Sequence, residues 1–219
     1  MKSNVQCVCL QGIYDLTVKI KICGLTNLSD AQAALAAGAD FLGFVFVRQS
    51  PRRAAPETVR EIVALLPRDT RTVGVFADQS AAEIRDIVDS CGLHIVQLHS
   101  NETVPLIRAL ADCGEIWKAV WPQAPQDLPA LTEIPADALV VDSATSQRRG
   151  GTGIVGDWSL AAQLARRRRT VLAGGLNPDN IVAAVEAVRP FAVDVASGVE
   201  SNPGIKDHEK IRAFCAALK

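Results

Sequence analysis

The chain has 219 residues, of which 48% are hydrophobic, and its formal net charge is −1. This length suits one domain or a compact pair, and the hydrophobic fraction supports a sizeable core. The near-neutral charge argues against a protein that binds nucleic acid or a membrane surface. Aromatic residues make up only 5% of the chain, and a composition rich in Ala, Val and Leu is typical of helices packed on parallel strands.

The sequence contains no run that is long and apolar enough to span a membrane. Residues 1–11 include one lysine and no sustained apolar core, which argues against a signal peptide. None of the six cysteines forms a C-x-x-C pair, and Cys7 and Cys9 are too close for ordinary disulfide or zinc geometry. We therefore expect reduced thiols, no metal site and a cytoplasmic protein.

A repeated pattern runs along the chain: a β-branched segment, a polar or glycine-containing loop, and an amphipathic helix. Strands are expected at residues 18–22, 41–46, 72–76, 94–98, 116–120, 139–141, 170–172 and 191–195. Helices are expected between them, for example at residues 29–37, 56–66, 81–90, 157–165, 177–188 and 206–218. Several begin with a Ser, Asp or Asn cap or with proline in the first turn, and Gly38 and Gly92 stand where two of them should end.

About eight strand–helix units over roughly 200 residues match the size of a single α/β (β/α)₈ TIM barrel. A doubly wound open sheet is the alternative, but no G-x-G-x-x-G motif follows the first strand. Four prolines lie in the fifth unit, between residues 122 and 135, so we expect a short or broken helix there. The barrel is predicted to span residues 17–219, after an N-terminal extension at residues 1–16 of unknown role.

The first strand ends at a thiol, in the segment Lys21-Ile22-Cys23-Gly24. Barrel enzymes place reactive side chains at the carboxyl ends of their parallel strands. Lys21 and Cys23 are two residues apart and so share one face of the strand, where the cation would favour the thiolate. The alternative is that Cys23 is an inert core residue, as many buried cysteines are.

Polar side chains also follow the second and fourth strands. Arg48, Arg52 and Arg53 either belong to a solvated loop or clamp a substrate carboxylate. Gln97 and His99 share one face of the fourth strand. His99 is either a structural histidine or a substrate contact.

The sixth strand ends in Asp142, which a long polar loop containing Gly150 and Gly151 follows. An aspartate after a buried run is often only a turn former or a helix cap. Here no helix follows at once, and loops of this length in compact domains are often functional. Asp142 is therefore a candidate site residue.

Glycines follow the seventh and eighth strands, as the pair Gly174-Gly175 and in the pair Ser197-Gly198. Glycine lets backbone N–H groups approach an anion, and a helix amino terminus adds positive potential. Loops after strands seven and eight often bind phosphate in barrels. One such pair would indicate only a turn, but two at neighbouring strand ends predict a phosphate site. The arginine run 166–169 follows a helix and is expected to face solvent.

In combination, these residues resemble the phosphoribosylanthranilate isomerase family, from Val18 to about Leu218. The matching segments are Lys21–Thr26, Gly43–Phe46, Ser50–Arg52, Gly74–Phe76, Val96–His99, Val141–Ser143, Gly150–Gly153, Asp157–Trp158, Gly174–Pro178 and Asp194–Glu200. The resemblance implies a barrel of the ribulose-phosphate-binding type without a cofactor. It also implies an intramolecular oxidoreductase (aldose–ketose isomerase) that rearranges N-(5-phospho-β-D-ribosyl)anthranilate to 1-(2-carboxyphenylamino)-1-deoxy-D-ribulose 5-phosphate. This is the third step of tryptophan synthesis from chorismate.

The resemblance assigns Cys23 as general base, Asp142 as general acid and Arg52 as the residue that binds the anthranilate carboxylate. We expect further substrate contacts from Gln97, His99 and Asp194. Phosphate contacts are expected from Gly151, Gly174, Gly175, Ser197 and Gly198. The chain departs from the family pattern at Val47, Arg48, Arg53 and Gly156, and the departures concern the anthranilate side of the pocket.

Two alternatives remain open from the sequence. One is another phosphosugar isomerase on the same barrel, although those of histidine synthesis use paired aspartates rather than a residue such as Cys23. The other is a non-catalytic sensor of phosphorylated ligands, because a fold alone does not prove a function. The expected partner is a small phosphoribosyl molecule, with no nucleic acid and no membrane, and the chain is expected to be a monomer or a homodimer.

Overall fold

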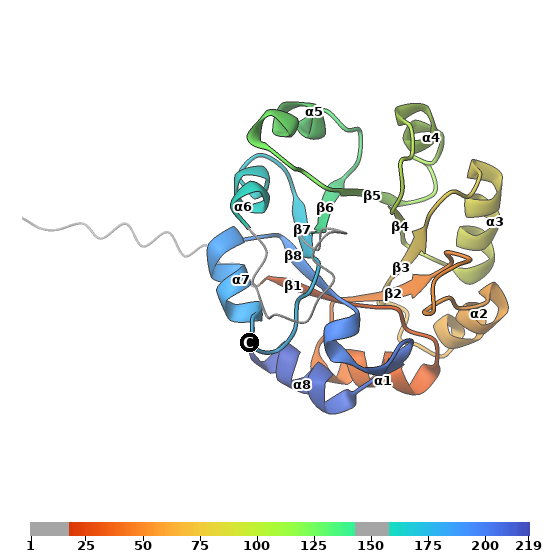
Figure 1. Cartoon of the computed structure of the whole chain (residues 1–219). Coiled ribbons are helices and arrows are strands. Elements are labelled where there is room, and N and C mark those ends of the chain that lie inside the picture. The colour runs from red at the N-terminus through yellow and green to blue at the C-terminus, as the bar shows by residue number, and fades with distance from the viewer. Residues whose placement is uncertain (1–17, 143–157) are drawn as a thin grey trace, which may run out of the picture.

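The computed structural model describes residues 18–142 and 158–219. Eight parallel strands close into a barrel in the order β1 to β8, and β1 pairs with β8. Figure 1 shows these strands as an inner ring with the helices around it, and α1 and α8 lie side by side where the two ends of the barrel meet. The expected (β/α)₈ barrel is confirmed. The proposed extension, residues 1–16, lies outside the described residues.

Each barrel strand lies within one residue of its expected bounds. They are β1 (Lys19–Cys23), β2 (Phe41–Val45), β3 (Arg71–Phe76), β4 (Ile95–Leu98), β5 (Glu115–Val120), β6 (Ala138–Asp142), β7 (Thr170–Ala173) and β8 (Ala192–Val195). These short segments are buried almost throughout, because a parallel strand covered by helices is buried on both faces.

The helices alternate with the strands. They are α1 (Leu28–Ala37), α2 (Pro56–Ala64), α3 (Ala81–Cys91), α4 (Val104–Ala109), α5 (Leu128–Thr132), α6 (Ser159–Ala165), α7 (Ile181–Val188) and α8 (His208–Ala216), with the 3₁₀ turns η1 (Pro125–Asp127) and η2 (Ser197–Val199). Gly38 and Gly92 end α1 and α3 with φ of 94° and 65°, a backbone conformation that favours glycine. None of the described helices is long and apolar enough to cross a membrane.

Helix α7 begins at Ile181, later than expected. The side-chain oxygen of Asn177 accepts hydrogen bonds from the backbone N–H groups of Asp179 and Asn180. This turn occupies the four residues before the helix, because an asparagine side chain can replace the backbone as a hydrogen-bond acceptor.

The fifth unit is short, as its prolines predict, with η1 followed by a five-residue α5. Arg168 supports it by donating hydrogen bonds to the carbonyls of Thr132, Ile134 and Ala136. The expectation that all of residues 166–169 face solvent is therefore wrong for Arg168, which satisfies carbonyls at the end of α5. Arg169 lies over the ring of Phe191.

The barrel interior is apolar toward the amino ends of the strands. Its residues are Phe41, Val73, Ile95, Trp117, Ala119, Ala138, Val140, Val171, Ala173 and Ala192. The rings of Phe41 and Trp117 meet edge to face at 5.0 Å. Above this layer the buried side chains of Lys21, Gln97 and Asp194 make the interior polar. The interior is therefore filled by apolar side chains toward the amino ends of the strands and is polar toward their carboxyl ends, where barrels of this type carry their functional sites.

A short antiparallel ribbon, β9 (Glu200–Asn202) with β10 (Ile205–Lys206), lies between β8 and α8. The sequence pattern does not predict it, because each strand is too short for a periodic signal. The ribbon places two buried charged residues, Glu200 and Lys206, beside the carboxyl ends of the strands.

Candidate active site

A cavity of about 400 Å³ opens at the carboxyl ends of the strands. Its lining comes from β1 to β4, from β6 to β8 and from the loops that follow them. The lining residues are Cys23, Val45, Val47, Ser50, Arg52, Val75, Gln97, His99, Asp142, Ala173, Gly174, Gly175, Leu176, Asp194, Val195, Ala196 and Ser197. This volume suits a small ligand. The cavity contains both predicted catalytic residues and all four predicted substrate contacts.

Cys23 is the last residue of β1 and pairs in register with Gly43 of β2. A Cβ at Gly43 would lie 2.9 Å from the Cys23 Sγ and 3.1 Å from the Lys21 Cε. Glycine at this position leaves room for both side chains. The contact also confirms that Lys21 and Cys23 share the inward face of β1.

The charge of Lys21 is paired with Asp194. The Lys21 Nζ donates a hydrogen bond of 2.8 Å to the Asp194 Oδ2, and the lysine side chain is fully buried. Burial raises the pKa of the Cys23 thiol, and the opposing effect of Lys21 does not outweigh it. Lys21 thus favours the thiolate as expected, but the net effect of the surroundings keeps Cys23 protonated at neutral pH.

Two buried oxygens in the polar layer, the Gln97 Oε1 and the Asp194 Oδ1, have no hydrogen-bond partner among the described residues. Both residues line the cavity. Because buried acceptors normally find a donor, these oxygens point to a ligand that carries O–H or N–H groups.

Asp142 ends β6 across the cavity, with its side chain 24% exposed. Its Oδ2 lies 3.8 Å from the His99 Nε2, and the His99 Nδ1 lies 3.2 Å from the Gln97 Nε2. Burial lowers the pKa of His99, so the ring is neutral at pH 7. With the Gln97 amide donating to Nδ1, the ring proton is assigned to Nε2, on the side of Asp142.

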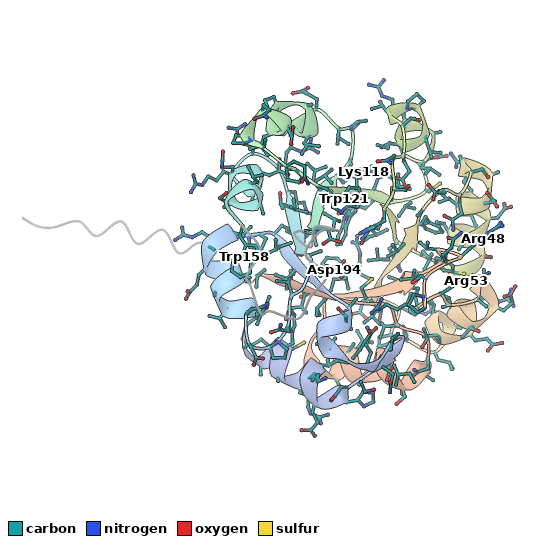
Figure 2. All side chains as sticks on the ribbon, viewed as in Figure 1. Arg48, Arg53, Lys118, Trp121, Trp158 and Asp194 are labelled. Atoms are coloured by element: carbon teal, nitrogen blue, oxygen red, sulfur yellow. The ribbon has the colours of Figure 1, made fainter. Side chains whose placement is uncertain are left out.

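Of the three arginines that follow β2, Arg52 lines the cavity. Arg48 and Arg53 line a separate surface groove beside α3, where Arg48 pairs with Glu83. Figure 2 shows these two arginines at the outer side of the barrel, away from Asp194 near its centre. The stem of Arg52 lies against Gly24, where a Cβ would be 2.8 Å from the Arg52 Cδ. Arg52 is therefore close to Cys23.

The two glycine loops are in direct contact. A Cβ at Gly198 would lie 1.9 Å from the backbone oxygen of Leu176, so only glycine allows this approach. Gly174 and Gly175 have φ of 92° and 67°, and both line the cavity together with Ser197. The predicted phosphate loops are thus neighbours. Gly198 permits their contact rather than lining the cavity, and Gly151 lies outside the described residues.

Three residues around the cavity escape prediction from the sequence. Trp121, shown with Lys118 in Figure 2, is 36% exposed and meets the His99 ring edge to face at 5.4 Å. Glu200 and Lys206 form an ion pair of 2.9 Å beside Arg52. Glu200 lies inside the segment Asp194–Glu200, which matches the family pattern. That position is the sequence signal that could have identified it.

The closed barrel and this cavity define a (β/α)₈-barrel enzyme whose site combines a thiol, a carboxyl group and two glycine loops. The family model described as N-(5'-phosphoribosyl)anthranilate (PRA) isomerase matches residues 20–217. The chain belongs to this family.

Curated relatives and solved structures agree with this assignment. The chain is 44% identical to N-(5'-phosphoribosyl)anthranilate isomerase of Geobacter sp. (strain M21), over 92% of this chain and 98% of the relative. It is 43% identical to the protein of the same name from Syntrophus aciditrophicus (strain SB), over 92% and 87%. The phosphoribosyl anthranilate isomerase from Thermotoga maritima superposes with a TM-score of 0.86 and 41% identity, over 92% of this chain and 98% of that one.

Proposed function

We propose that this chain converts N-(5-phospho-β-D-ribosyl)anthranilate into 1-(2-carboxyphenylamino)-1-deoxy-D-ribulose 5-phosphate, a step of tryptophan synthesis. The observation that carries the proposal is that Cys23 and Asp142 line one cavity together with Arg52 and residues of the glycine loops. A solved relative with a TM-score of 0.82 and 39% identity was crystallised with the reduced form of this product. That finding supports the same ligand class for this chain.

The cavity suggests one orientation for the substrate. The anthranilate carboxylate would lie at Arg52, because a guanidinium recognises carboxylates through paired N–H groups. The phosphate would lie at the backbone N–H groups of Gly175 and Ser197, where the φ of 67° at Gly175 exposes the main chain. The ribose would lie between them, with its hydroxyls donating to the Gln97 Oε1 and the Asp194 Oδ1.

Asp142 would act first, as general acid. It would donate its proton to the furanose ring oxygen, the C1–O bond would break, and the anthranilate nitrogen would become part of a Schiff base. The proton then remains on the freed hydroxyl group. The neutral His99 ring, with its proton on Nε2, would stabilise the carboxylate that Asp142 becomes.

Cys23 would then act as general base. Its thiolate would remove the proton from ribose C2, and the electron pair of that C–H bond would neutralise the iminium to give an enolamine. The enolamine would tautomerise to the ketone of the product. A thiol with a raised pKa is a stronger base once deprotonated, but less of it is ionised at pH 7.

The described lining brings both proposed catalytic residues together within one chain. The Thermotoga maritima protein is described as dimeric and was also solved as monomers, so we propose a monomer or a homodimer. The four cysteines of the described ranges are free thiols. This supports the cytoplasm as the compartment.

The test is a fluorescence assay on the purified chain. The anthranilate adduct is generated in the cuvette, and its fluorescence should fall as the ketone forms. Cys23→Ala and Cys23→Ser should remain folded by circular dichroism and lose at least ~10² in kcat, the usual contribution of a general base. A Cys23→Ala variant that retains a tenth of the wild-type kcat would rule out the assigned role of Cys23.

A further inference from the structure

Glu200 is the first residue of β9, and its carboxylate is almost completely buried against Arg52. The Arg52 Nε donates to the Glu200 Oε1 at 2.8 Å, and the Arg52 Nη2 donates to the Glu200 Oε2 at 2.7 Å. Two parallel hydrogen bonds of this length fix both the distance and the plane of a guanidinium.

Other groups hold the same carboxylate in place. The Lys206 Nζ, fully buried, donates to the Glu200 Oε1 at 2.9 Å and to the backbone oxygen of Ala196 at 3.1 Å. The backbone N–H of Gly204 also donates to the Glu200 Oε1, at 3.3 Å. Glu200 and Lys206 lie on the two paired strands of one ribbon. The carboxylate is therefore fixed before any ligand enters.

Glu200 remains charged in this environment. Burial alone would raise the pKa of its carboxyl group, but the hydrogen bonds from Arg52 and Lys206 outweigh burial and hold that pKa below its ordinary value. Burial lowers the pKa of Lys206, although its ion pair with Glu200 opposes that effect. Arg52 and a protonated Lys206 together give the three side chains a net positive charge of one. That surplus is available to an anion in the adjacent cavity.

We propose that Glu200 is a positioning residue that holds the guanidinium of Arg52 ready for the substrate carboxylate. A guanidinium has five N–H groups, and Glu200 engages two nitrogens of Arg52. The N–H groups on the remaining edge are left to meet the ligand. Without Glu200, the long and half-buried side chain of Arg52 would have to be ordered on binding, and the entropy cost of that ordering weakens affinity.

The proposal rests on the proposed function, because it takes Arg52 as the group that binds the anthranilate carboxylate. The alternative is that Glu200 competes with the substrate carboxylate for Arg52 and so weakens substrate binding. The two roles predict opposite effects of removing its charge.

The first experiment measures direct binding of two ligands by calorimetry. One is reduced 1-(2-carboxyphenylamino)-1-deoxyribulose 5-phosphate, and the other is its reduced phenylamino counterpart without the carboxylate. For Glu200→Gln, the Kd of the carboxylate ligand should rise at least about tenfold, which corresponds to ~1.4 kcal/mol. The Kd of the phenylamino ligand should remain at its wild-type value, a difference that a general loss of structure would not produce.

Loss of Glu200 also leaves the buried Lys206 without its ion-pair partner and could unfold the chain. A second comparison avoids this problem. The reference protein is the single variant Lys206→Met, and the test protein is the double variant that carries both Glu200→Gln and Lys206→Met. The same rise in Kd should appear between these two variants, because both lack the buried lysine. The kcat of each active variant should change much less than its KM.

Glu115→Gln is the matched control at the opposite end of the barrel. Glu115 also pairs with arginines, Arg71 and Arg169, at 2.9 and 2.7 Å. Its substitution should lower stability and leave both Kd values unchanged.

These measurements distinguish a failure of the proposed function from a failure of the positioning role of Glu200. If the wild-type chain binds neither ligand, the proposed function fails. If it binds both ligands equally, Arg52 does not recognise the carboxylate and the positioning role fails with it. If the wild type prefers the carboxylate ligand and the Glu200 variants keep or strengthen that preference, the positioning role is overturned.

Discussion

At the residue scale, the site depends on how burial and charge act together on Cys23. The thiol lies beside a buried cation, Lys21, but that cation already pairs with Asp194 at 2.8 Å. Burial therefore decides the direction in which the pKa of Cys23 moves. The result is a strong base that is mostly protonated at pH 7.

This arrangement predicts a definite pH dependence. A raised pKa means that the thiolate fraction of Cys23 increases as pH rises through neutrality, while the protonated fraction of Asp142, the proposed general acid, falls. Plotted against pH, kcat/KM should therefore reflect both groups and pass through a maximum rather than rise steadily. The thiolate absorbance can be measured as a function of pH for the wild type and for Cys23→Ala. The difference between the two curves should give a pKa above about 8.5, the ordinary value of cysteine. A difference titration with a midpoint below that value would show that Lys21 outweighs burial.

Asp142 gives the second prediction at this scale. Asp142→Asn keeps the shape of the side chain but removes the proton that the ring oxygen needs, so kcat should fall at least ~10². Binding of the reduced product analogue should persist, because the contacts assigned to Arg52 and to the glycine loops are retained. The measurements are steady-state turnover and calorimetric Kd. A variant with near-normal kcat would contradict the role of general acid.

At the element scale, the loops after β7 and β8 depend on each other. Gly198 has to be glycine because the backbone of Leu176 occupies the space of a side chain. At Gly175, by contrast, a Cβ would meet nothing within 4 Å, although φ is 67°. A side chain at Gly175 is thus strained by the backbone and would occupy the open space beside the cavity.

Gly175→Val should therefore weaken the binding of phosphorylated ligands much more than the binding of anthranilate alone. The matched control is Gly92→Val, because Gly92 has a φ of 65° but ends α3, and a Cβ there would meet only the Val63 side chain at 4.0 Å. Both variants should lose stability through the same left-handed strain. Calorimetry with product and with anthranilate measures the difference. Equal losses of phosphate affinity in both variants would place the phosphate elsewhere.

At the scale of the whole molecule, closure of the barrel brings the chemistry together. The pairing of β1 with β8 places Lys21 in register with Asp194, although the two residues are 173 positions apart. The same closure brings Arg52 to Glu200 across 148 positions. The site therefore exists only when the sheet is complete.

Barrel closure starts at β1, whose first residue is Lys19, and the family model matches from residue 20. A chain of residues 17–219 with an added initiating methionine should have the Tm and kcat/KM of the full chain. Thermal unfolding and the fluorescence assay measure both quantities. A lower Tm or a loss of turnover would assign residues 1–16 a part in the barrel.

The amino-acid sequence by itself determined the strands, the barrel and the positions of the chemical groups at the strand ends. These are local properties: a β-branched run, a capping residue or a glycine pair is visible within a few positions. Two features were not predicted for the same reason. The start of α7 depends on a turn that the Asn177 side chain forms, and the ribbon of β9 and β10 consists of strands too short to show a periodic pattern.

Only the tertiary structure decided which charges meet. Three neighbouring arginines look alike in sequence, yet Arg52 faces the cavity whereas Arg48 and Arg53 lie in another groove. Likewise, Lys21 pairs with Asp194, and Glu200 holds Arg52. The physical reason is that the strength of a charge pair depends on distance and burial, and both quantities are set by the closure of the sheet between residues that are remote in the chain.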